Sequence, residues 1–389
     1  MSSWSVRPSS DPGAPTPGED GMDHTETGRR SDARTVGVQA VEDAMRRALE
    51  LAAEGPAHGP NPRVGCVLLD PAGRTVAEGF HRGAGTPHAE AAALAAARAA
   101  GADPRGTTAV VTLEPCAHHG RTGPCADALI EAGVAAVHVA VADPNPVATG
   151  GADRLRAAGI EVTTGTLAEE GEELLRPWLH AVRTGRPWVT LKLATSLDGR
   201  VAAPDGTSRW ITGSAARAHA HRVRAQVDAI AVGSGTVLTD DPSLTARTLD
   251  GGLFEHQPLR VVVGTRAVPD GARLRGPGGP LLHLPTHDLD EVLRTLGERE
   301  VRHLLVEGGP TLATALLAAY AVDELHAYVA PVLLGAGASA VAPFGVTTIG
   351  EAARLATRSV TRLGDDVLLV ARRAPTQNGR PARPTKEEI

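Results

Sequence analysis

The chain has 389 residues, of which 42% are hydrophobic, and its formal net charge is −6. This length and composition indicate two domains of ordinary size, and no apolar run approaches the 18 residues of a membrane span. A weakly acidic chain with 2% aromatic residues is not typical of a nucleic-acid-binding protein, so we expect neither nucleic acid nor a membrane as a partner.

The two ends of the chain differ in composition from the middle. Residues 1–36 are rich in Pro, Gly, Ser, Asp and Thr without periodicity, and 373–389 are similar, so both predict disordered tails. The first of them lacks the apolar stretch of a secretory signal. Three cysteines, a small and odd number, do not indicate a disulfide framework, and this favours the reducing cytoplasm.

Alternating helix and strand patterns predict an α/β domain over residues 37–183, with helices packed on a sheet. Apolar residues at helical spacing mark a helix at about 40–54, and short β-branched runs bounded by turns mark strands. In chain order the further predicted elements are strands at 64–69 and 75–80, a helix at 88–100, a strand at 107–113, a helix at 125–132, a strand at 135–143, and a last helix, strand and closing helix before residue 187.

A second α/β domain is predicted over residues 187–372, after a boundary near 180–187. Its clear strands lie at 188–194, 228–234, 258–264, 303–309 and 324–334. Its clearest helices lie at 214–226, 289–298 and 310–320. Polar residues fall at the strand ends and turns, where open α/β sheets bind ligands.

Two fragments of the first domain together match the pattern of a zinc deaminase. "TPHAEAAAL" supplies His88 and Glu90 at a helix start, and "EPCAHHGRTGPCADAL" supplies Cys116 in a loop and Cys125 at the next helix start. Such enzymes need one His and two Cys on the metal and a Glu that is not a ligand, in the order H-x-E then P-C-x-x-C. Here the second cysteine arrives later than the motif states.

The chemistry explains these residue types. Zinc lowers the pKa of a bound water towards ~7, and Glu90 can take the proton from that water and pass it on to the substrate. The positive end of a helix favours a thiolate at Cys125. His118 and His119 compete as ligands but rank below the softer thiolate, so we expect them in a loop facing the substrate. Cys66, inside the apolar run "VGCVLL", is expected to be a core residue.

The second domain lacks a G-x-G-x-x-G fingerprint after its first strand. "LLVEGGPTLATALL" instead places two glycines after a strand and Pro310 at the start of a helix. A helix N-terminus with small residues suits a phosphate or pyrophosphate, although a tight strand-to-helix turn explains the pattern equally well.

Four segments resemble the deaminase half of the bifunctional riboflavin-biosynthesis deaminase–reductase family: "NPRVGCVL", "GFHRGAGTPHAEAAAL", "VTLEPCAHHGRTGPCADALIEAG" and "VADPNP". In that family the long spacing between the cysteines is normal. The resemblance implies a cytidine-deaminase-like α/β/α domain, zinc ligands at His88, Cys116 and Cys125, and a proton shuttle at Glu90. It also places Asn61 in the pocket. Gly123 stands where the family usually has Pro.

"TLKLATSLDGR", "SRWITGS" and "HRVRAQVDAIAVGSGTVLTDDPSLTAR" resemble the reductase half, a dihydrofolate-reductase-like domain that uses NADPH. Arg209 stands where the family often has Gln, and "VVVGTRAVP" replaces its usual Asp-Ser-Arg. The positions that match substrate contacts are Ser208, Arg224, Leu244, Arg247 and Glu307, to which His118 is added in the first domain. The positions that match NADP contacts are Ala194, Trp210, Thr236, Asp240, Thr265, Gly309, Pro310, Thr311, Leu312, Ala313, Thr314 and Ala315.

The resemblance implies two successive steps of riboflavin synthesis. A zinc-dependent hydrolytic deamination of 2,5-diamino-6-ribosylamino-4(3H)-pyrimidinone 5′-phosphate is followed by NADPH-dependent reduction of the ribosyl group. The expected partners are small phosphorylated pyrimidines, and the family suggests a cytoplasmic homo-oligomer. Two other classes remain open. One is a nucleoside, base or transfer-RNA deaminase fused to an inactive reductase-like module, and the other is a non-enzymatic protein with a structural, four-ligand zinc site.

Overall fold

The computed structural model describes residues 36–118 and 123–373. The predicted tails, apart from Val36 and Arg373, and the loop residues His119, Arg121 and Thr122 lie outside these ranges. All described residues belong to one of the two units into which the chain divides, Thr35–Ile389. The predicted boundary near 180–187 includes residues 185–187, which separate the helix Ala168–Thr184 from the strand Trp188–Ser196.

The first half is built on a five-stranded sheet in the order β2-β1-β3-β4-β5. β1 pairs antiparallel with β2 and β3, whereas β3, β4 and β5 run parallel. The sequence GCVLL of β1 and TAVVTL of β3 are buried throughout, as expected for strands covered on both faces. The bounds are Gly65–Leu69 (β1), Thr75–Phe80 (β2), Thr108–Leu113 (β3), Ala136–Val141 (β4) and Glu161–Thr164 (β5).

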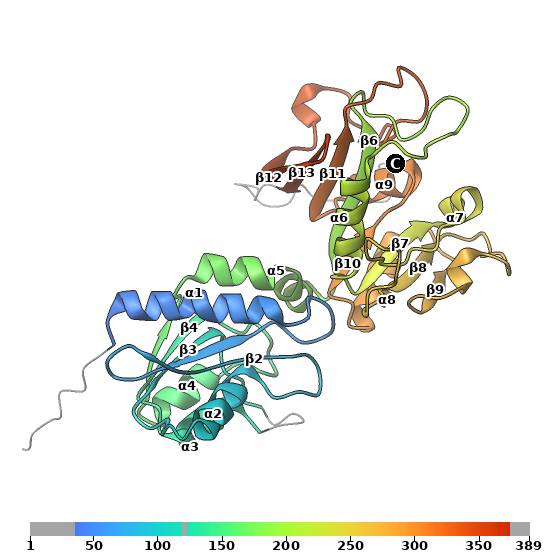
Figure 1. The fold of residues 1–389 in the computed structure, drawn as a ribbon. Helices are drawn as coiled ribbons and strands as arrows, with labels where there is room; N and C mark the ends of the chain where they lie inside the picture. The colour runs from blue at the N-terminus through green and yellow to red at the C-terminus, as the bar shows by residue number, and fades with distance from the viewer. Residues whose placement is uncertain (1–35, 119–122, 374–389) are drawn as a thin grey trace, which may run out of the picture. The chain divides into compact units, whose positions relative to one another are not determined.

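Helices cover both faces of this sheet (Figure 1). α1 (Val38–Glu54) and α5 (Ala168–Thr184) share one core with the sheet. α2 (Ala89–Ala99), α3 (Cys125–Ala132) and α4 (Gly151–Ala157) pack on the other face, in a core that also holds the fully buried Cys66. The expected α/β/α domain is therefore confirmed, and Cys66 is the core residue that its apolar neighbours indicate.

The second half is built on an eight-stranded sheet in the order β12-β13-β11-β6-β10-β7-β8-β9. The strands from β11 to β9 run parallel, and β13 and β12 add antiparallel at the β11 edge. The bounds are Trp188–Ser196 (β6), Ala229–Gly233 (β7), Leu259–Val263 (β8), Leu281–Leu284 (β9), His303–Val306 (β10), Glu324–Ala330 (β11), Leu355–Leu363 (β12) and Asp366–Arg373 (β13).

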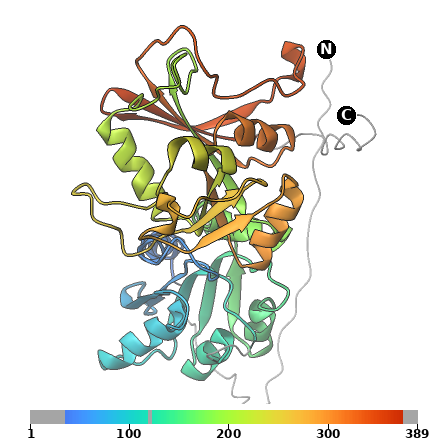
Figure 2. The same cartoon turned by 90° about the vertical axis from the view of Figure 1, so that its right-hand side faces the viewer.

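Helices also lie on the two faces of the second sheet, with α6 on one side and α8 on the other in Figure 2. α8 (Leu289–Glu298) and α9 (Pro310–Ala318) share a core with alternate residues of the strands, while α6 (Ser214–Arg224) and α7 (Ser234–Asp240) pack with the residues between them. Single 3₁₀ turns occur at Arg273–Arg275 and Ile349–Glu351. This mixed α/β architecture agrees with the dihydrofolate-reductase-like prediction.

Several elements differ from the sequence prediction. β9, β12, β13 and α7 were not among the elements that the sequence marked clearly. β12 is exposed along nearly its whole length, so it has no apolar face to produce an alternating pattern. The strand predicted over 324–334 ends at Ala330, because Pro331 has no N–H for the ladder.

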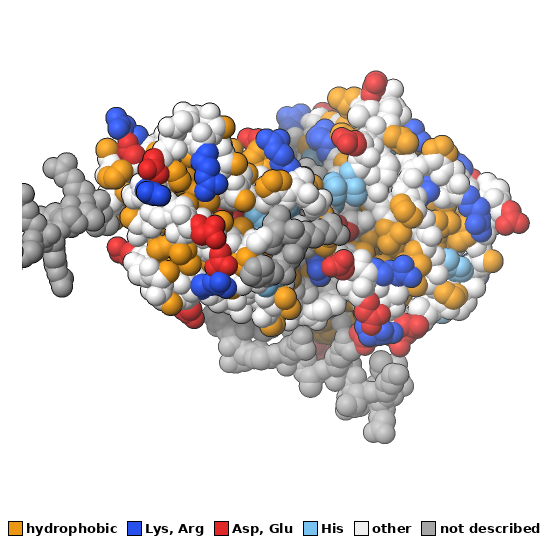
Figure 3. Space-filling model, turned by 90° about the horizontal axis from the view of Figure 1, so that it is seen from below, with side chains coloured by type: hydrophobic (Ala, Val, Ile, Leu, Met, Phe, Trp, Pro, Cys, Tyr) orange, Lys and Arg blue, Asp and Glu red, His pale blue; other side chains and the backbone are white. Residues whose placement is uncertain are grey.

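The surface carries charges of both signs. On the face drawn in Figure 3, basic and acidic side chains are interspersed. In the described part of the chain, no helix combines the length and apolar character needed to cross a membrane.

Candidate functional sites

Three predicted metal ligands meet at the starts of α2 and α3. His88 precedes the first residue of α2, Cys125 is the first residue of α3, and Cys116 lies in the loop after β3. The Nδ1 atom of His88 lies 3.7 Å from Sγ of Cys116 and 3.3 Å from Sγ of Cys125. All three donor atoms lie within 4.8 Å of one another. Residues from two separate fragments therefore form one cluster.

The cluster fits a zinc ion. Zn–S bonds of about 2.3 Å and Zn–N bonds of about 2.0–2.1 Å in a tetrahedron put a nitrogen and a sulfur ligand about 3.5 Å apart. The observed N–S distances bracket that value. Among the described residues the cluster contains three ligands, one His and two Cys, and this number leaves a fourth position for water or substrate. A three-ligand site is typical of catalytic rather than structural zinc.

The pKa values of the two thiols shift in opposite directions. A hydrogen bond between the sulfurs lowers the pKa of Cys116 and, with burial, raises the pKa of Cys125. The backbone N–H at the start of α3 donates to Sγ of Cys116 at 3.4 Å. The start of α3 thus supplies an N–H donor to the Cys116 sulfur as well as the cysteine Cys125 itself. A zinc ion would take both as thiolates.

Glu90 lies in the first turn of α2, two residues after His88, and is 3% exposed. Burial raises the pKa of its carboxyl, and its own backbone N–H and the charge on His88 partly offset this effect. A carboxyl that contacts the Cys125 thiol but is not among the three clustered ligand atoms has the position of a proton carrier beside the metal.

Glu114 organises the loop that carries Cys116, and sequence reasoning missed it. Its buried carboxylate accepts hydrogen bonds from the backbone N–H groups of Asp143 at 3.2 Å, Gly150 at 3.2 Å and Ala152 at 3.0 Å. A Cβ at Gly151 would lie 1.7 Å from the carbonyl oxygen of Pro115, so this approach requires glycine. An acidic residue directly after a fully buried strand was the available signal.

His81 links Asn61 to the metal cluster. Its Nδ2 donates to Nε2 of His81 at 2.9 Å, and Nδ1 of His81 bonds the Pro87 carbonyl at 3.0 Å. Burial lowers the pKa of His81, which suits this neutral tautomer, and its ring meets that of His88 edge-on at 5.4 Å. The buried Nδ1 of His118 has no hydrogen-bond partner among the described residues and is available to a ligand.

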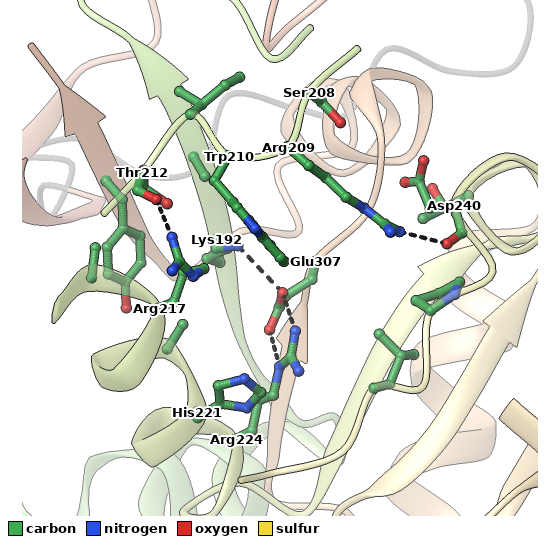
Figure 4. Close-up of a pocket in the computed structure, with 18 of the residues that line it drawn as sticks. Lys192, Ser208, Arg209, Trp210, Thr212, Arg217, His221, Arg224, Asp240 and Glu307 are labelled. Carbon is green, nitrogen blue, oxygen red and sulfur yellow. Dashed lines mark hydrogen bonds and ion pairs between the residues drawn. The ribbon is translucent and has the colours of Figure 1, made fainter. Parts of the chain in front are cut away.

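The second half contains a cavity of about 600 Å³ (Figure 4). It opens above β6, β7, β10 and β11 and beside α6. All five residues predicted to contact the reductase substrate line it, and so do four of the residues predicted to contact NADP. The five are Ser208, Arg224, Leu244, Arg247 and Glu307, and the four are Ala194, Trp210, Thr236 and Asp240.

Glu307 forms the centre of an ion-pair network on the cavity wall. β10 and β6 pair with Val306 opposite Leu191, so the next residues, Glu307 and Lys192, become neighbours. The Glu307 carboxylate binds Nζ of Lys192 at 3.3 Å and receives two hydrogen bonds from Arg224, at 2.6 and 2.9 Å. Figure 4 shows these three side chains converging.

The network keeps Glu307 ionised. Burial alone would raise the pKa of its carboxyl, but Arg224 and Lys192 outweigh burial and hold the pKa well below its usual range. The remaining N–H groups of Arg224 are partly used as well, since Nη1 donates to the Thr245 carbonyl at 2.9 Å. Arg224 therefore faces the cavity as a fixed, largely neutralised group.

The cavity as a whole is strongly basic. Its lining includes six cationic side chains against two carboxylates. Arg247 is held by Thr245 Oγ1 at 3.0 Å and the Gly251 carbonyl at 3.0 Å, and Arg209 by the Asp240 carbonyl at 2.8 Å. These partners are neutral oxygens, so the positive charge of both arginines is retained for an anionic ligand. The cations are Lys192, Arg209, Arg217, Arg224, Arg247 and Arg273.

The other predicted NADP contacts, Thr265 and Gly309–Ala315, do not line this cavity. Thr265 follows β8 and Gly309 follows β10, and β7 lies between these strands. All three strands are parallel, so their carboxyl ends share one edge. Thr236, which does line the cavity, accepts the Gly309 N–H at 3.2 Å and so links this edge to α9.

The structure gives different surroundings to two residues without a predicted role. Lys192 lines the cavity, whereas Asp198 does not. The Asp198 carboxylate receives hydrogen bonds from Ser196 Oγ at 2.7 Å and from the N–H groups of Leu334 and Gly335. Asp198 therefore ties the residues after β11 to the end of β6. Two cavity residues that the sequence did not suggest, Arg217 and His221, lie on α6.

Comparison with known proteins matches one family model in the first half of the chain and another in the second. Residues 38–141 match the family model of the cytidine and deoxycytidylate deaminase zinc-binding region, and residues 187–369 match that of the RibD C-terminal domain. Fold and sites thus define a bifunctional enzyme, a zinc-dependent deaminase followed by a reductase. The chain belongs to the RibD family of riboflavin biosynthesis proteins. The cofactors of its two halves are zinc and NADPH.

The relatives match across nearly their whole length. The riboflavin biosynthesis protein RibD of Mycobacterium tuberculosis is 51% identical over 335 residues, covering 85% of this chain and 97% of its own. RibD of Escherichia coli K12 is 43% identical over 361 residues, covering 84% and 97%. These matches do not favour a transfer-RNA deaminase or a structural zinc protein.

Solved structures agree. The diaminohydroxyphosphoribosylaminopyrimidine deaminase/5-amino-6-(5-phosphoribosylamino)uracil reductase of Thermotoga maritima superposes with a TM-score of 0.80 at 34% identity, covering 87% of this chain and 99% of its own. RibD of Acinetobacter baumannii also has a TM-score of 0.80, at 39% identity, covering 87% and 100%. Both halves of the chain therefore follow the arrangement of the family.

Proposed function

We propose that this enzyme deaminates 2,5-diamino-6-ribosylamino-4(3H)-pyrimidinone 5′-phosphate in its first half and reduces the ribosyl group of the product in its second. The observation that carries the proposal is the pairing of a three-ligand His–Cys–Cys cluster, with Glu90 beside it, and a separate basic cavity in one chain. The first site suits hydrolytic removal of an amine, and the second suits two phosphorylated ligands.

In the deaminase half, His88, Cys116 and Cys125 hold the metal. Zinc in this position supplies a water of lowered pKa. Glu90 is placed to take one proton from such a water and carry it to the ring nitrogen, and then to carry the second proton, from the added hydroxyl, to the departing amine. Glu90 is buried beside the three ligands.

Substrate contacts in this half come from Asn61 and His118. Asn61 is oriented by His81, which leaves its side-chain oxygen for a donor on the pyrimidine. His118 offers its unpaired ring nitrogen from the loop that follows Cys116. Both groups thus approach the ring from segments that adjoin the metal ligands.

In the reductase half, bound NADPH would supply a hydride to the anomeric carbon of the ribosyl group. Reduction breaks the bond between that carbon and the ring oxygen, which then takes a proton. The ammonium of Lys192 is a positioned donor on the cavity wall, and Glu307 holds it there. Arg247 retains its charge for the 5-phosphate, with Ser208, Leu244 and Arg224 completing the substrate half.

The residues that would hold the cofactor lie at the carboxyl ends of the parallel strands. Ala194, Trp210, Thr236 and Asp240 contact it from the cavity. The edge that carries Thr265 and the Gly309–Ala315 turn receives its remaining part, since Thr236 already joins the two regions. A helix start with glycine, proline and small side chains allows close approach of a pyrophosphate.

A single assay separates the two activities. The full chain is given the pyrimidinone phosphate and NADPH, and ammonia release and NADPH oxidation are followed independently, with and without a zinc chelator. We expect the chelator to abolish ammonia release while the already deaminated substrate still oxidises NADPH. Ammonia release that survives metal removal, confirmed by metal analysis, would contradict the proposed deaminase site. Failure of the deaminated substrate to oxidise NADPH would contradict the reductase assignment.

We also propose that the enzyme acts in the cytoplasm as a homo-oligomer. Relatives named as bacterial biosynthetic enzymes support the location. The exposed apolar side chains of Val360 (66% exposed) on β12 and Val367 (38% exposed) on β13 support self-association. Sedimentation equilibrium of the purified chain measures the oligomeric state. A monomer at micromolar concentration would contradict the proposed homo-oligomer.

A further inference from the structure

Trp210 has an unusual setting for a large aromatic residue. It lies in the long connection between β6 and α6, lines the reductase cavity, and is 70% exposed. So much apolar surface at the opening of a binding cavity is expected to meet a ligand. An exposed indole on a connection, however, has few contacts of its own to fix its orientation.

Arg217 supplies such a contact. Its guanidinium carbon lies 4.5 Å from the centroid of the Trp210 ring, within the range of a cation–π interaction. Nη1 of the same group donates to the carbonyl oxygen of Thr212 at 2.6 Å. Arg217 therefore binds both the ring and the backbone two residues after it, and Figure 4 shows the two side chains adjacent in the cavity.

The arginine is the fixed partner of this pair. It lies in the first turn of α6, beside Ala216, which is 1% exposed. The start of this helix is tied to the sheet because the Gly213 N–H donates to the Asp366 carboxylate at 2.7 Å. Contact between an anchored cation and an exposed ring lowers the freedom of the ring.

We propose that Arg217 is a positioning residue of the reductase, which orients Trp210 as a wall of the cofactor-binding part of the cavity. This inference rests on the proposed role of Trp210 as a cofactor contact. Arg224 lies further along the same helix, α6, and its charge is neutralised by Glu307. The charge of Arg217 is instead directed to an aromatic face. Pre-orientation of the ring favours NADPH binding because less freedom is lost in the complex.

The test is Arg217→Met, which keeps a long side chain and removes the charge. We expect the KM for NADPH to rise about 2- to 10-fold, the size of one cation–π contact, with kcat within about twofold of the wild-type value. The matched control is Arg222→Met, since Arg222 is exposed on the same helix and does not line the cavity. Arg217→Lys keeps a cation and should fall between wild type and Arg217→Met. An unchanged melting temperature of the transition that includes the second sheet shows that the reductase half of each variant is folded.

A double-mutant cycle distinguishes positioning from direct contact. If Arg217 acts through the ring, Arg217→Met has no further effect on the KM for NADPH once Trp210→Ala is present. An equal rise in both backgrounds would mean that Arg217 binds the cofactor directly and would overturn the positioning role. An unchanged KM in Arg217→Met would overturn it as well. If Trp210→Ala itself leaves the KM unchanged, the proposed role of Trp210 fails first.

Fluorescence gives a readout that does not depend on turnover. The contribution of Trp210 is the difference between the emission of the wild-type chain and that of Trp210→Ala. We expect acrylamide to quench this contribution more readily in Arg217→Met without NADPH, because the ring has lost its partner. Equal quenching in wild type and Arg217→Met would show that the arginine does not restrain the ring and would contradict the proposal.

Discussion

Replacement of Glu307 by glutamine measures how far the reductase cavity depends on one carboxylate. The Glu307 side chain is 8% exposed and contacts Lys192 and Arg224, whose side chains are 22% and 16% exposed. Glu307→Gln keeps the shape but leaves two largely buried cations without a counter-charge. Breaking a buried ion pair in this way destabilises a protein by about 3–5 kcal/mol.

Calorimetry on the full chain checks this magnitude. For a domain of this size, about 3–5 kcal/mol corresponds to a fall in melting temperature of roughly 6–20 °C in the transition that includes the second sheet. Glu298→Gln is the matched control. Glu298 pairs with Arg294 at 2.6 Å, but their side chains are 60% and 62% exposed, so we expect a change below about 1 kcal/mol.

The pH dependence gives a second check. Lys192 and Arg224 outweigh the effect of burial and hold the folded pKa of Glu307 below its value of about 4.3 in the unfolded chain. Its ion pairs therefore contribute stability that is fully present above about pH 4.3 and is lost as the pH falls towards the folded pKa. The difference between wild type and Glu307→Gln should be constant from about pH 6 to 8 and should shrink below about pH 4.3. A Glu307→Gln variant as stable as Glu298→Gln, with unchanged reductase kinetics, would refute the reasoning.

Three further variants test single contacts. Glu90→Gln should retain zinc by metal analysis but release ammonia at least about 10²-fold more slowly, and wild-type ammonia release would remove its assigned role. Arg247→Ala should raise the KM for the phosphorylated reductase substrate and leave the KM for NADPH unchanged; equal use of the unphosphorylated analogue by wild type would contradict a phosphate contact. Glu114→Gln should lower zinc affinity about 10-fold or more, measured by competition with a chelator, because its three backbone partners lose a charged acceptor. Unchanged affinity would show that the loop holds Cys116 without it.

The metal cluster could be predicted from sequence because each of its parts is local. His88 and Cys125 both lie at helix starts. The two helices, α2 and α3, directly precede and follow one buried strand, β3. Short motifs therefore determine which atoms can meet. What the sequence did not indicate was the support of the loop by Glu114, since its backbone partners lie 29 to 38 residues away.

The reductase cavity depends instead on long-range register. Lys192 and Glu307 are separated by 115 residues, and Arg224 and Glu307 by 83. Taken alone, each of these three residues resembles an ordinary polar residue at a strand end or on a helix. The family resemblance selected Arg224 and Glu307, but the position of Lys192 beside Glu307 follows from the parallel pairing of β6 and β10. No sequence motif indicated Arg217, because its partner is the face of an aromatic ring.

These two ways of building a site predict different consequences of mutation. A metal cluster of local ligands loses its function when one ligand changes, while the core of α2, α3 and the first sheet remains packed. The reductase network joins β6, β10 and α6, so removal of Glu307 affects both ligand binding and the stability of the second sheet. Arg217 differs from both, since it contacts an exposed ring and contributes little to the core. Its variants should therefore change cofactor binding with little change in melting temperature, which separates a positioning residue from a structural one.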